Sequence, residues 1–180
     1  MGKLVLITGG CRSGKSHFAQ SYVEEISENK VFLATCPKID REMDERIEKH
    51  KKDREGLGWR TVEEDLDLVS AIKGIKGDIL IDCLTLWVNN LLYHNPNLTE
   101  SEMKNKVCEI AELVQRRDGL CVFVSNEVGL GLVPADSTSR LYRDLVGRCN
   151  QTFAQFADEV HFMVSGINMQ CKPRINHTKN

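Results

Sequence analysis

An eight-residue segment near the start of the chain has the residue types and spacing that bind the phosphates of a nucleotide. It fits the pattern Gly, four residues, Gly-Lys-Ser at every position, and it consists of Gly9, Gly10, Cys11, Arg12, Ser13, Gly14, Lys15 and Ser16. The backbone N–H groups of such a loop surround phosphate oxygens, and the positive end of the following helix adds to their attraction. We expect Lys15 to reach the β- and γ-phosphates and Ser16 to hold Mg²⁺ through its hydroxyl. A chance Gly-rich turn is the alternative interpretation.

Asp82 is the candidate for a second Mg²⁺ ligand. It ends the apolar, strand-like segment at 78–82. In phosphate-loop proteins a metal-binding acid stands at the carboxyl end of a strand beside the loop, where it holds Mg²⁺ directly or through water. The alternative is a structural role, in which Asp82 caps a helix that starts at Leu84. The phosphate loop favours the metal-binding role.

His50 is the candidate nucleophile. It follows Met43 by seven residues and Ile47 by three, so all three share one face of a predicted helix at 40–52. A neutral imidazole attacks phosphorus, and an unperturbed pKa of about 6.5 leaves histidine mostly neutral at pH 7. From this pattern alone, a structural histidine at the edge of the core on a solvated basic helix is the favoured interpretation. Nearby cations would lower the pKa and neutralise a triphosphate, and they are Arg46, Lys49, Lys51, Lys52 and Arg54.

These residues need strands and helices that bring them to one edge of a sheet. The chain alternates between short apolar runs and segments of helical periodicity, which indicates a mostly parallel central sheet with helices on both faces. This is the three-layer α/β fold of the phosphate-loop NTPases, and we expect one nucleotide-binding domain over residues 1–180 with a loose tail from about 168 to 180. The predicted strands are 4–8, 30–35, 59–62, 78–82, 120–125 and 160–164, and the predicted helices are 18–26, 40–52, 66–72, 84–93, 99–114 and 137–157. Thr99 and Glu102 are expected to form a capping box at the start of the helix at 99–114.

Composition and charge exclude several classes of protein. Of the 180 residues 28% are charged and the net charge is −2, which gives no sign of a nucleic-acid-binding or membrane-surface protein. No apolar stretch reaches membrane-spanning length, and we expect no signal peptide before the first strand. Seven cysteines, an odd number without C-x-x-C spacing, argue against a disulfide framework and a structural zinc site. Reduced thiols in a cytoplasmic protein are the expectation.

Two motifs that would narrow the class of nucleotide-binding protein are missing from the sequence. It has no Asn-Lys-x-Asp segment, which disfavours a switch GTPase, and no Gly-Lys-Gly-Thr loop of the adenylate-kinase type. The loop by itself therefore leaves a kinase, a motor ATPase and a nucleotidyltransferase open.

Further segments, taken with the loop, resemble one protein family. From Leu4 to about Ile167 the chain is similar to the bifunctional adenosylcobinamide kinase / adenosylcobinamide-phosphate guanylyltransferases of cobalamin biosynthesis. The segments His50-Lys51 and 126–129 (Asn-Glu-Val-Gly) are together far more specific than the loop. The other matching segments are Ala34-Thr35, Glu42-Met43, Arg46-Ile47, Trp59-Arg60-Thr61, Asp82-Cys83-Leu84-Thr85, Asn89-Asn90-Leu91, Val133-Pro134, Arg140, Tyr142-Arg143-Asp144, Gly147, Asn150-Gln151 and Ser165-Gly166.

Two positions depart from the residues that are usual in this family. Cys11 stands where alanine is more common, a change of little consequence because the loop binds through its backbone. Asp82 stands where relatives often have the longer Glu, so the metal geometry would differ slightly. The tail beyond Ile167 matches no role in the family.

The resemblance implies two reactions. In the first, ATP or GTP phosphorylates the aminopropanol hydroxyl of adenosylcobinamide. In the second, GTP transfers GMP to adenosylcobinamide phosphate and releases pyrophosphate. By position, His50 corresponds to the family's guanylylated histidine, which makes this transfer two displacements, while Lys15 serves the triphosphate in both reactions. Outside the loop, the positions that correspond to the family's nucleotide contacts are Ala34, Thr35, Cys36, Lys51, Lys52, Asp53, Arg54, Glu63 and Asp82.

The resemblance also implies a homotrimer with active sites near subunit boundaries.

The roles of two acidic residues, Glu63 and Glu127, each have competing interpretations. Glu63 could contact nucleotide, or the run that it opens could simply start a helix. Glu127 follows a strand at its carboxyl end and could orient the attacking hydroxyl, but it could equally cap its loop or pair with Arg140 or Arg143.

Two other functions stay open at this point. One is a small-molecule kinase that never uses His50, and the other is a non-enzymatic nucleotide-binding module whose loop acts as a ligand-gated assembly switch. The bifunctional enzyme predicts a covalent guanylyl adduct on His50, the kinase predicts phosphate transfer without an adduct, and the module predicts binding without turnover.

Overall fold

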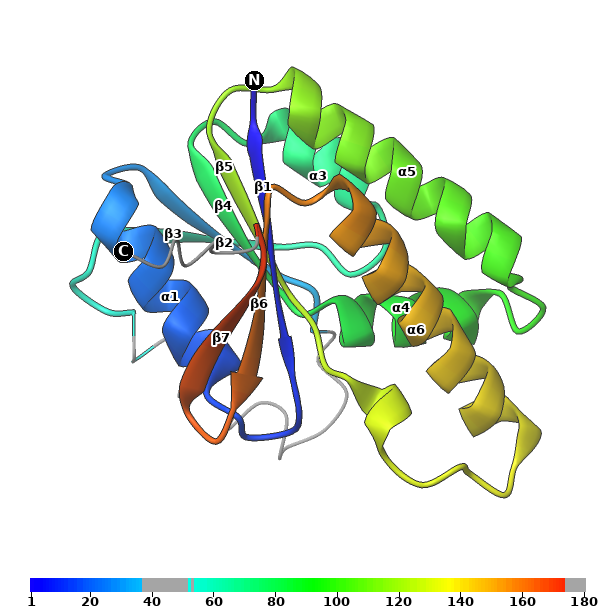
Figure 1. The fold of residues 1–180 in the computed structure, drawn as a ribbon. Helices are drawn as coiled ribbons and strands as arrows, with labels where there is room; N and C mark the ends of the chain where they lie inside the picture. The colour runs from blue at the N-terminus through cyan, green and yellow to red at the C-terminus, as the bar shows by residue number, and fades with distance from the viewer. Residues whose placement is uncertain (37–51, 53, 174–180) are drawn as a thin grey trace.

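The computed structural model describes residues 1–36, 52 and 54–173. Within this part of the chain the strands of the central sheet lie in the order β3-β2-β4-β5-β1-β6-β7 (Figure 1). Their bounds are β1 Lys3–Gly9, β2 Lys30–Ala34, β3 Trp59–Glu63, β4 Asp78–Asp82, β5 Leu120–Val124, β6 Glu159–Val164 and β7 Ile167–Lys172. The six strands predicted from the sequence are therefore confirmed.

Helices cover both faces of this sheet (Figure 1). The helix α1 packs on one face in a core with Val5 and Ile7 of β1, while Leu4 and Leu6 point into the larger core on the other face. That larger core contains α3, α4, α5 and α6. The predicted three-layer α/β fold is confirmed. The helix bounds are α1 Lys15–Ile26, α3 Leu68–Gly74, α4 Leu84–His94, α5 Glu100–Arg116, the 3₁₀ helix η1 Val128–Leu130 and α6 Ser137–Phe156.

The strand order determines where a ligand can bind. The strand β1 pairs in parallel with β5 and β6, and β2, β3 and β4 continue the same parallel arrangement beyond β5. The carboxyl ends of these strands therefore share one edge of the sheet, which is the side where open α/β sheets bind ligands.

The predicted capping box at the start of α5 is also present, with Thr99 and Glu102 bonded reciprocally.

The expectation of a loose tail from residue 168 is wrong for residues 168–172. These residues belong to β7, which pairs antiparallel with β6. Ser165 and Gly166 connect the two strands with φ values of +51° and +83°, the backbone conformation of a tight two-residue hairpin turn. Because β7 is largely exposed, its sequence carries little hydrophobic periodicity, and this strand was not recognised from the pattern.

The predicted helix at 40–52 lies almost entirely outside the described residues, since only Lys52 of this segment is included. Among the described residues, no helix combines the length and the apolar character needed to span a membrane.

Candidate functional site

The phosphate-loop segment connects β1 to α1 at the carboxyl edge of the sheet (Figure 1). Its path needs backbone conformations that glycine adopts at little cost, with φ of +150° at Gly9 and +93° at Gly14, the N-cap of α1. A Cβ on Gly9 would lie 2.4 Å from the carbonyl oxygen of Met163, so close packing against β6 also requires glycine there. The N–H of Gly166 donates to the Ser13 carbonyl at 3.0 Å and ties the loop to the β6–β7 turn.

The side chain of Lys15 is buried within the loop. Its ammonium group donates to the carbonyl oxygen of Gly10 and lies 3.4 Å from the hydroxyl oxygen of Ser13. Burial lowers the pKa of Lys15, and the negative charge of Asp82, with smaller effects of Cys11, Cys83 and Glu127, acts in the opposite direction. Because the pKa is lowered overall, these groups offset only part of the effect of burial.

Several predicted site residues stand at one level on adjacent strands. Ala34, at the end of β2, is in register with Glu63 on β3 and with Asp82 on β4. Asp82 is in register with Val124 on β5, and Val124 with Ile7 on β1, just before the loop. The sheet thus brings Ala34, Glu63 and Asp82 to the edge that holds the loop.

Ser16 and Asp82 fit a Mg²⁺ ion that arrives with a nucleotide. Ser16 lies in the first turn of α1 and offers a hydroxyl oxygen, and the half-buried Asp82 offers a carboxylate. Mg²⁺ takes one or two such oxygens from the protein and the rest from phosphates and water. Within the described part of the chain no group of three or more His, Cys, Asp or Glu side chains could hold a metal alone. The N-cap of α4 is Cys83, so the capping role considered for Asp82 is wrong.

Thr35 has a structural role that the sequence did not reveal. Its buried hydroxyl accepts from the N–H of Cys83 and donates to the carbonyl oxygen of the same residue, both at 2.8 Å. The amide of Asn90 donates to the Thr35 carbonyl oxygen at 2.9 Å. Thr35 thus fixes the end of β2 to the end of β4. Burial raises the pKa of Cys83 to about 11, which keeps this thiol neutral.

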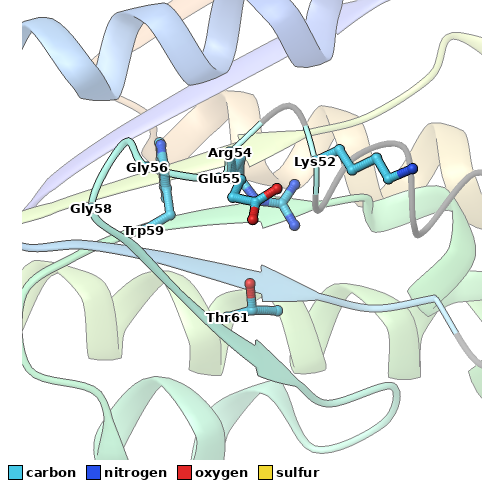
Figure 2. A pocket seen from close by; sticks show the side chains of 7 residues that line it. All are labelled: Lys52, Arg54, Glu55, Gly56, Gly58, Trp59 and Thr61. Atoms are coloured by element: carbon cyan, nitrogen blue, oxygen red, sulfur yellow. The ribbon is translucent and has the colours of Figure 1, made fainter.

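Lys52 and Arg54 line a pocket of about 760 Å³ beside β2 and β3 (Figure 2). Arg54 is buried, and its guanidinium carbon lies 3.5 Å from the centre of the Phe32 ring in a cation–π contact. Lys52 is exposed, and its side chain extends away from Arg54 (Figure 2). The structure therefore places Arg54 against the sheet. The other lining residues are Glu55, Gly56, Gly58, Trp59 and Thr61.

Glu63 is exposed at the end of β3 and does not start a helix. The helix α3 begins at Leu68, and its cap is Asp67, whose carboxylate accepts from the N–H of Ser70 at 3.0 Å. Glu64 supports the same turn, because it accepts from the N–H of Asp67 at 2.8 Å. The helix-start interpretation of Glu63 is therefore wrong.

Thr85 and Asn150 contact this edge of the sheet, although they were not predicted as site residues. Asn126 donates to the Thr85 hydroxyl at 3.2 Å, and Asn150 donates to the Glu127 carboxylate at 3.1 Å. Both residues fall in segments that resemble the family, Asp82-Cys83-Leu84-Thr85 and Asn150-Gln151, and this resemblance was the available signal. By contrast His50, Lys51 and Asp53 lie outside the described residues.

Comparison with known proteins identifies the family. The family model "Cobinamide kinase / cobinamide phosphate guanyltransferase" matches residues 5–171. The chain belongs to this family. The similar proteins include the bifunctional adenosylcobalamin biosynthesis protein CobU of Salmonella typhimurium, with 36% identity over 94% of this chain and 99% of the relative. CobU of Escherichia coli is 37% identical over the same shares, and the bifunctional protein CobP of Pseudomonas aeruginosa is 37% identical over 93% and 96%.

More distant solved structures add little to this assignment. The flagellar accessory protein FlaH from Methanocaldococcus jannaschii aligns with a TM-score of 0.46 and 13% identity, over 93% of this chain and 75% of that chain. A likeness of that size does not bear on function. The assignment to the cobinamide kinase / cobinamide phosphate guanyltransferase family therefore rests on the sequence match, which spans the loop, Asp82 and Glu127.

Replacement of Gly9 by alanine is expected to destabilise the protein, because the new Cβ would meet the Met163 carbonyl oxygen at 2.4 Å and φ is +150°. We expect the free energy of unfolding, measured by urea denaturation, to fall by about 1–3 kcal/mol. Gly10→Ala is the matched control, because a Cβ there meets nothing within 4 Å. Its free energy of unfolding should stay within about 0.5 kcal/mol of wild type. Equal stabilities of the two variants would contradict the close packing of the loop on β6.

Proposed function

We propose that this protein is a bifunctional enzyme of cobalamin biosynthesis that phosphorylates adenosylcobinamide and then transfers GMP to the phosphorylated product. One observation carries the proposal: a phosphate loop with a buried Lys15, at the sheet edge where Asp82 ends β4 and Glu127 follows β5, in a chain that the cobinamide kinase / cobinamide phosphate guanyltransferase model matches over residues 5–171. The names of the three relatives describe the same bifunctional class of protein.

In the kinase reaction, the loop holds the triphosphate of ATP or GTP. The ammonium group of Lys15 exchanges its contact with the Gly10 carbonyl for oxygens of the β- and γ-phosphates. The N–H groups of residues 10–16 and the N-terminus of α1 also attract the phosphate oxygens, and they need no rearrangement to do so. Ala34, Thr35 and Cys36 bound the nucleotide site at the end of β2, where Thr35 fixes the strand end, because its hydroxyl, its N–H and its carbonyl oxygen all bond to other residues of the protein.

Ser16 and Asp82 are the residues that would hold Mg²⁺ in this site. Bound there with the nucleotide, the ion would neutralise charge on the phosphate oxygens. The negative charge of Asp82 also favours the protonated form of Lys15, because it acts to raise the pKa of that side chain. Loss of the Asp82 charge would affect both the ion and the lysine.

In the guanylyl transfer, His50 is the nucleophile. An imidazole nitrogen forms a bond to the α-phosphorus of GTP while the bond to the pyrophosphate oxygen breaks, which gives a phosphoramidate and free pyrophosphate. A phosphate oxygen of adenosylcobinamide phosphate then displaces the imidazole and takes the GMP group. The basic residues around His50 support this role by their charge, although this part of the proposal rests on the sequence and the family.

We further propose that the enzyme is a cytoplasmic homotrimer. Large apolar side chains exposed at the end of η1 and in the segment after it support an interface between subunits, since contiguous exposed apolar groups mark such surfaces. They are Leu130 at 74% exposure, Leu132 at 97% and Val133 at 71%. This segment begins three residues beyond Glu127, so a subunit boundary there would lie near the proposed active site.

The guanylyl-histidine intermediate can be tested with GTP labelled at the α-phosphorus. After incubation with Mg²⁺, wild-type protein should carry label that is acid-labile and alkali-stable, and His50→Ala should carry none. His94→Ala is the matched control, because His94 is exposed at the end of α4 and should leave the labelling unchanged. Absence of label on wild-type protein that binds GTP would reject the guanylyl transfer and leave a kinase or a nucleotide-binding module.

The role of Asp82 can be tested through the Mg²⁺ requirement of the kinase reaction. Asp82→Asn keeps the shape of the side chain but removes its charge, so the Mg²⁺ concentration for half-maximal rate should rise by about tenfold or more. Asp118→Asn is the control, since Asp118 is fully exposed beside the N-terminus of the chain. A Mg²⁺ dependence that is identical in the Asp82→Asn variant and wild type would contradict the assignment.

A further inference from the structure

Glu127 is a carboxylate beside the phosphate loop, and the nucleotide-binding roles proposed above do not use it. It follows β5, the strand between β1 and β4. Its N–H donates to the carbonyl oxygen of Gly9 at 3.0 Å, which fixes its backbone to the first residue of the phosphate loop. Glu127 is therefore held next to the loop that is expected to bind the transferred phosphate.

Asn150 holds the carboxylate of Glu127 from α6. Asn150 is only 6% exposed, and its Nδ2 donates to Oε1 of Glu127 and to the carbonyl oxygen of Asn126, both at 3.1 Å. The hydroxyl of Ser125 donates to Oδ1 of Asn150 at 2.6 Å and so fixes the orientation of the amide. One oxygen of the Glu127 carboxylate is thus occupied and oriented, and a substrate hydroxyl can use the other.

The arginines considered as partners of Glu127 make other contacts. Arg143 donates to the carbonyl oxygen of Gly129, and Arg140 donates to the carbonyl oxygen of Pro134 at 3.1 Å and to that of Ala135. Arg143 thus holds η1 in place, and Arg140 holds the segment that follows it. The position of Glu127 is instead fixed by its backbone bond to Gly9 and its side-chain bond to Asn150.

We propose that Asn150 is a positioning residue that holds Glu127 ready to receive the proton of the substrate hydroxyl in the kinase reaction. This inference rests on the function proposed above. The hydroxyl oxygen forms a bond to the γ-phosphorus, the bond from that phosphorus to the bridging β–γ oxygen breaks, and the nucleoside diphosphate leaves. The hydroxyl proton passes to Glu127 and then to solvent.

The inference separates the two reactions of the enzyme. The nucleophiles of guanylyl transfer are a neutral imidazole and an ionised phosphate oxygen, and neither has a hydroxyl proton to lose. Asn150 and Glu127 should therefore matter for phosphorylation of adenosylcobinamide and much less for formation of the guanylyl adduct.

The test uses Asn150→Asp, which keeps the acceptor for Ser125 but replaces the donor to Glu127 by a second negative charge. We expect the kcat for phosphorylation of adenosylcobinamide to fall about 10- to 100-fold, with the KM for nucleotide within about threefold of wild type. Glu127→Gln should lower kcat at least as far, again with little change in the KM for nucleotide.

Thr152→Val is the matched control, because Thr152 is equally buried on α6 but bonds only to the carbonyl oxygen of Arg148 among the described residues. Its kcat and its KM for nucleotide should match wild type. A wild-type kcat in Asn150→Asp would overturn the inference, and so would a parallel loss of guanylyl labelling, which would indicate a general structural defect. Failure of the wild-type protein to phosphorylate adenosylcobinamide would contradict the proposed function itself, and this result is obtained before any variant is compared.

Discussion

The buried ammonium group of Lys15 is the constraint on which this edge of the sheet depends. A cation removed from water is costly unless it is compensated, and here the Gly10 carbonyl, the Ser13 hydroxyl and the charge of Asp82 offset part of that cost. These groups belong to the loop after β1 and to the end of β4, so the two strands must end at the same edge of the sheet. In the proposed function a triphosphate replaces the loop carbonyl as the partner of the ammonium group, and one loop serves both reactions.

Hydrogen bonds between side chains and strand ends keep those charges in place. Thr35 joins the end of β2 to Cys83, Thr85 at the start of α4 accepts from Asn126 after β5, and Asn150 of α6 bonds to the carbonyl oxygen of Asn126. Each contact crosses from one element to another, so the positions of the carboxylates depend on the packing of the helices on the sheet. Acidic groups that are oriented before the substrate binds can interact with charge that develops in the transition state without first reorganising. Such preorganisation accounts for much of the rate enhancement of enzymes.

The features that the sequence predicted are those encoded within a few residues of each other. The strand–turn–helix setting of the loop, six strands and the capping box at Thr99 all have local signals, and the structure confirms them. The strand β7 could not be recognised because it is mostly exposed, and the contact of Asn150 with Glu127 could not because it joins residues 23 apart through the packing of α6. The assignment of His50 came from the family resemblance rather than from its helical spacing, and it stays a prediction.

The most direct test of the account is a product analysis by mass spectrometry, with each reaction started separately from adenosylcobinamide or its phosphate in the presence of GTP and Mg²⁺. The account predicts that wild-type protein forms the phosphate in the first case and adenosylcobinamide-GDP in the second, and that Lys15→Met forms neither. Lys106→Met, which alters an exposed lysine on α5, should form both. Guanylyl transfer that survives in Lys15→Met would contradict the claim that one loop serves the two reactions.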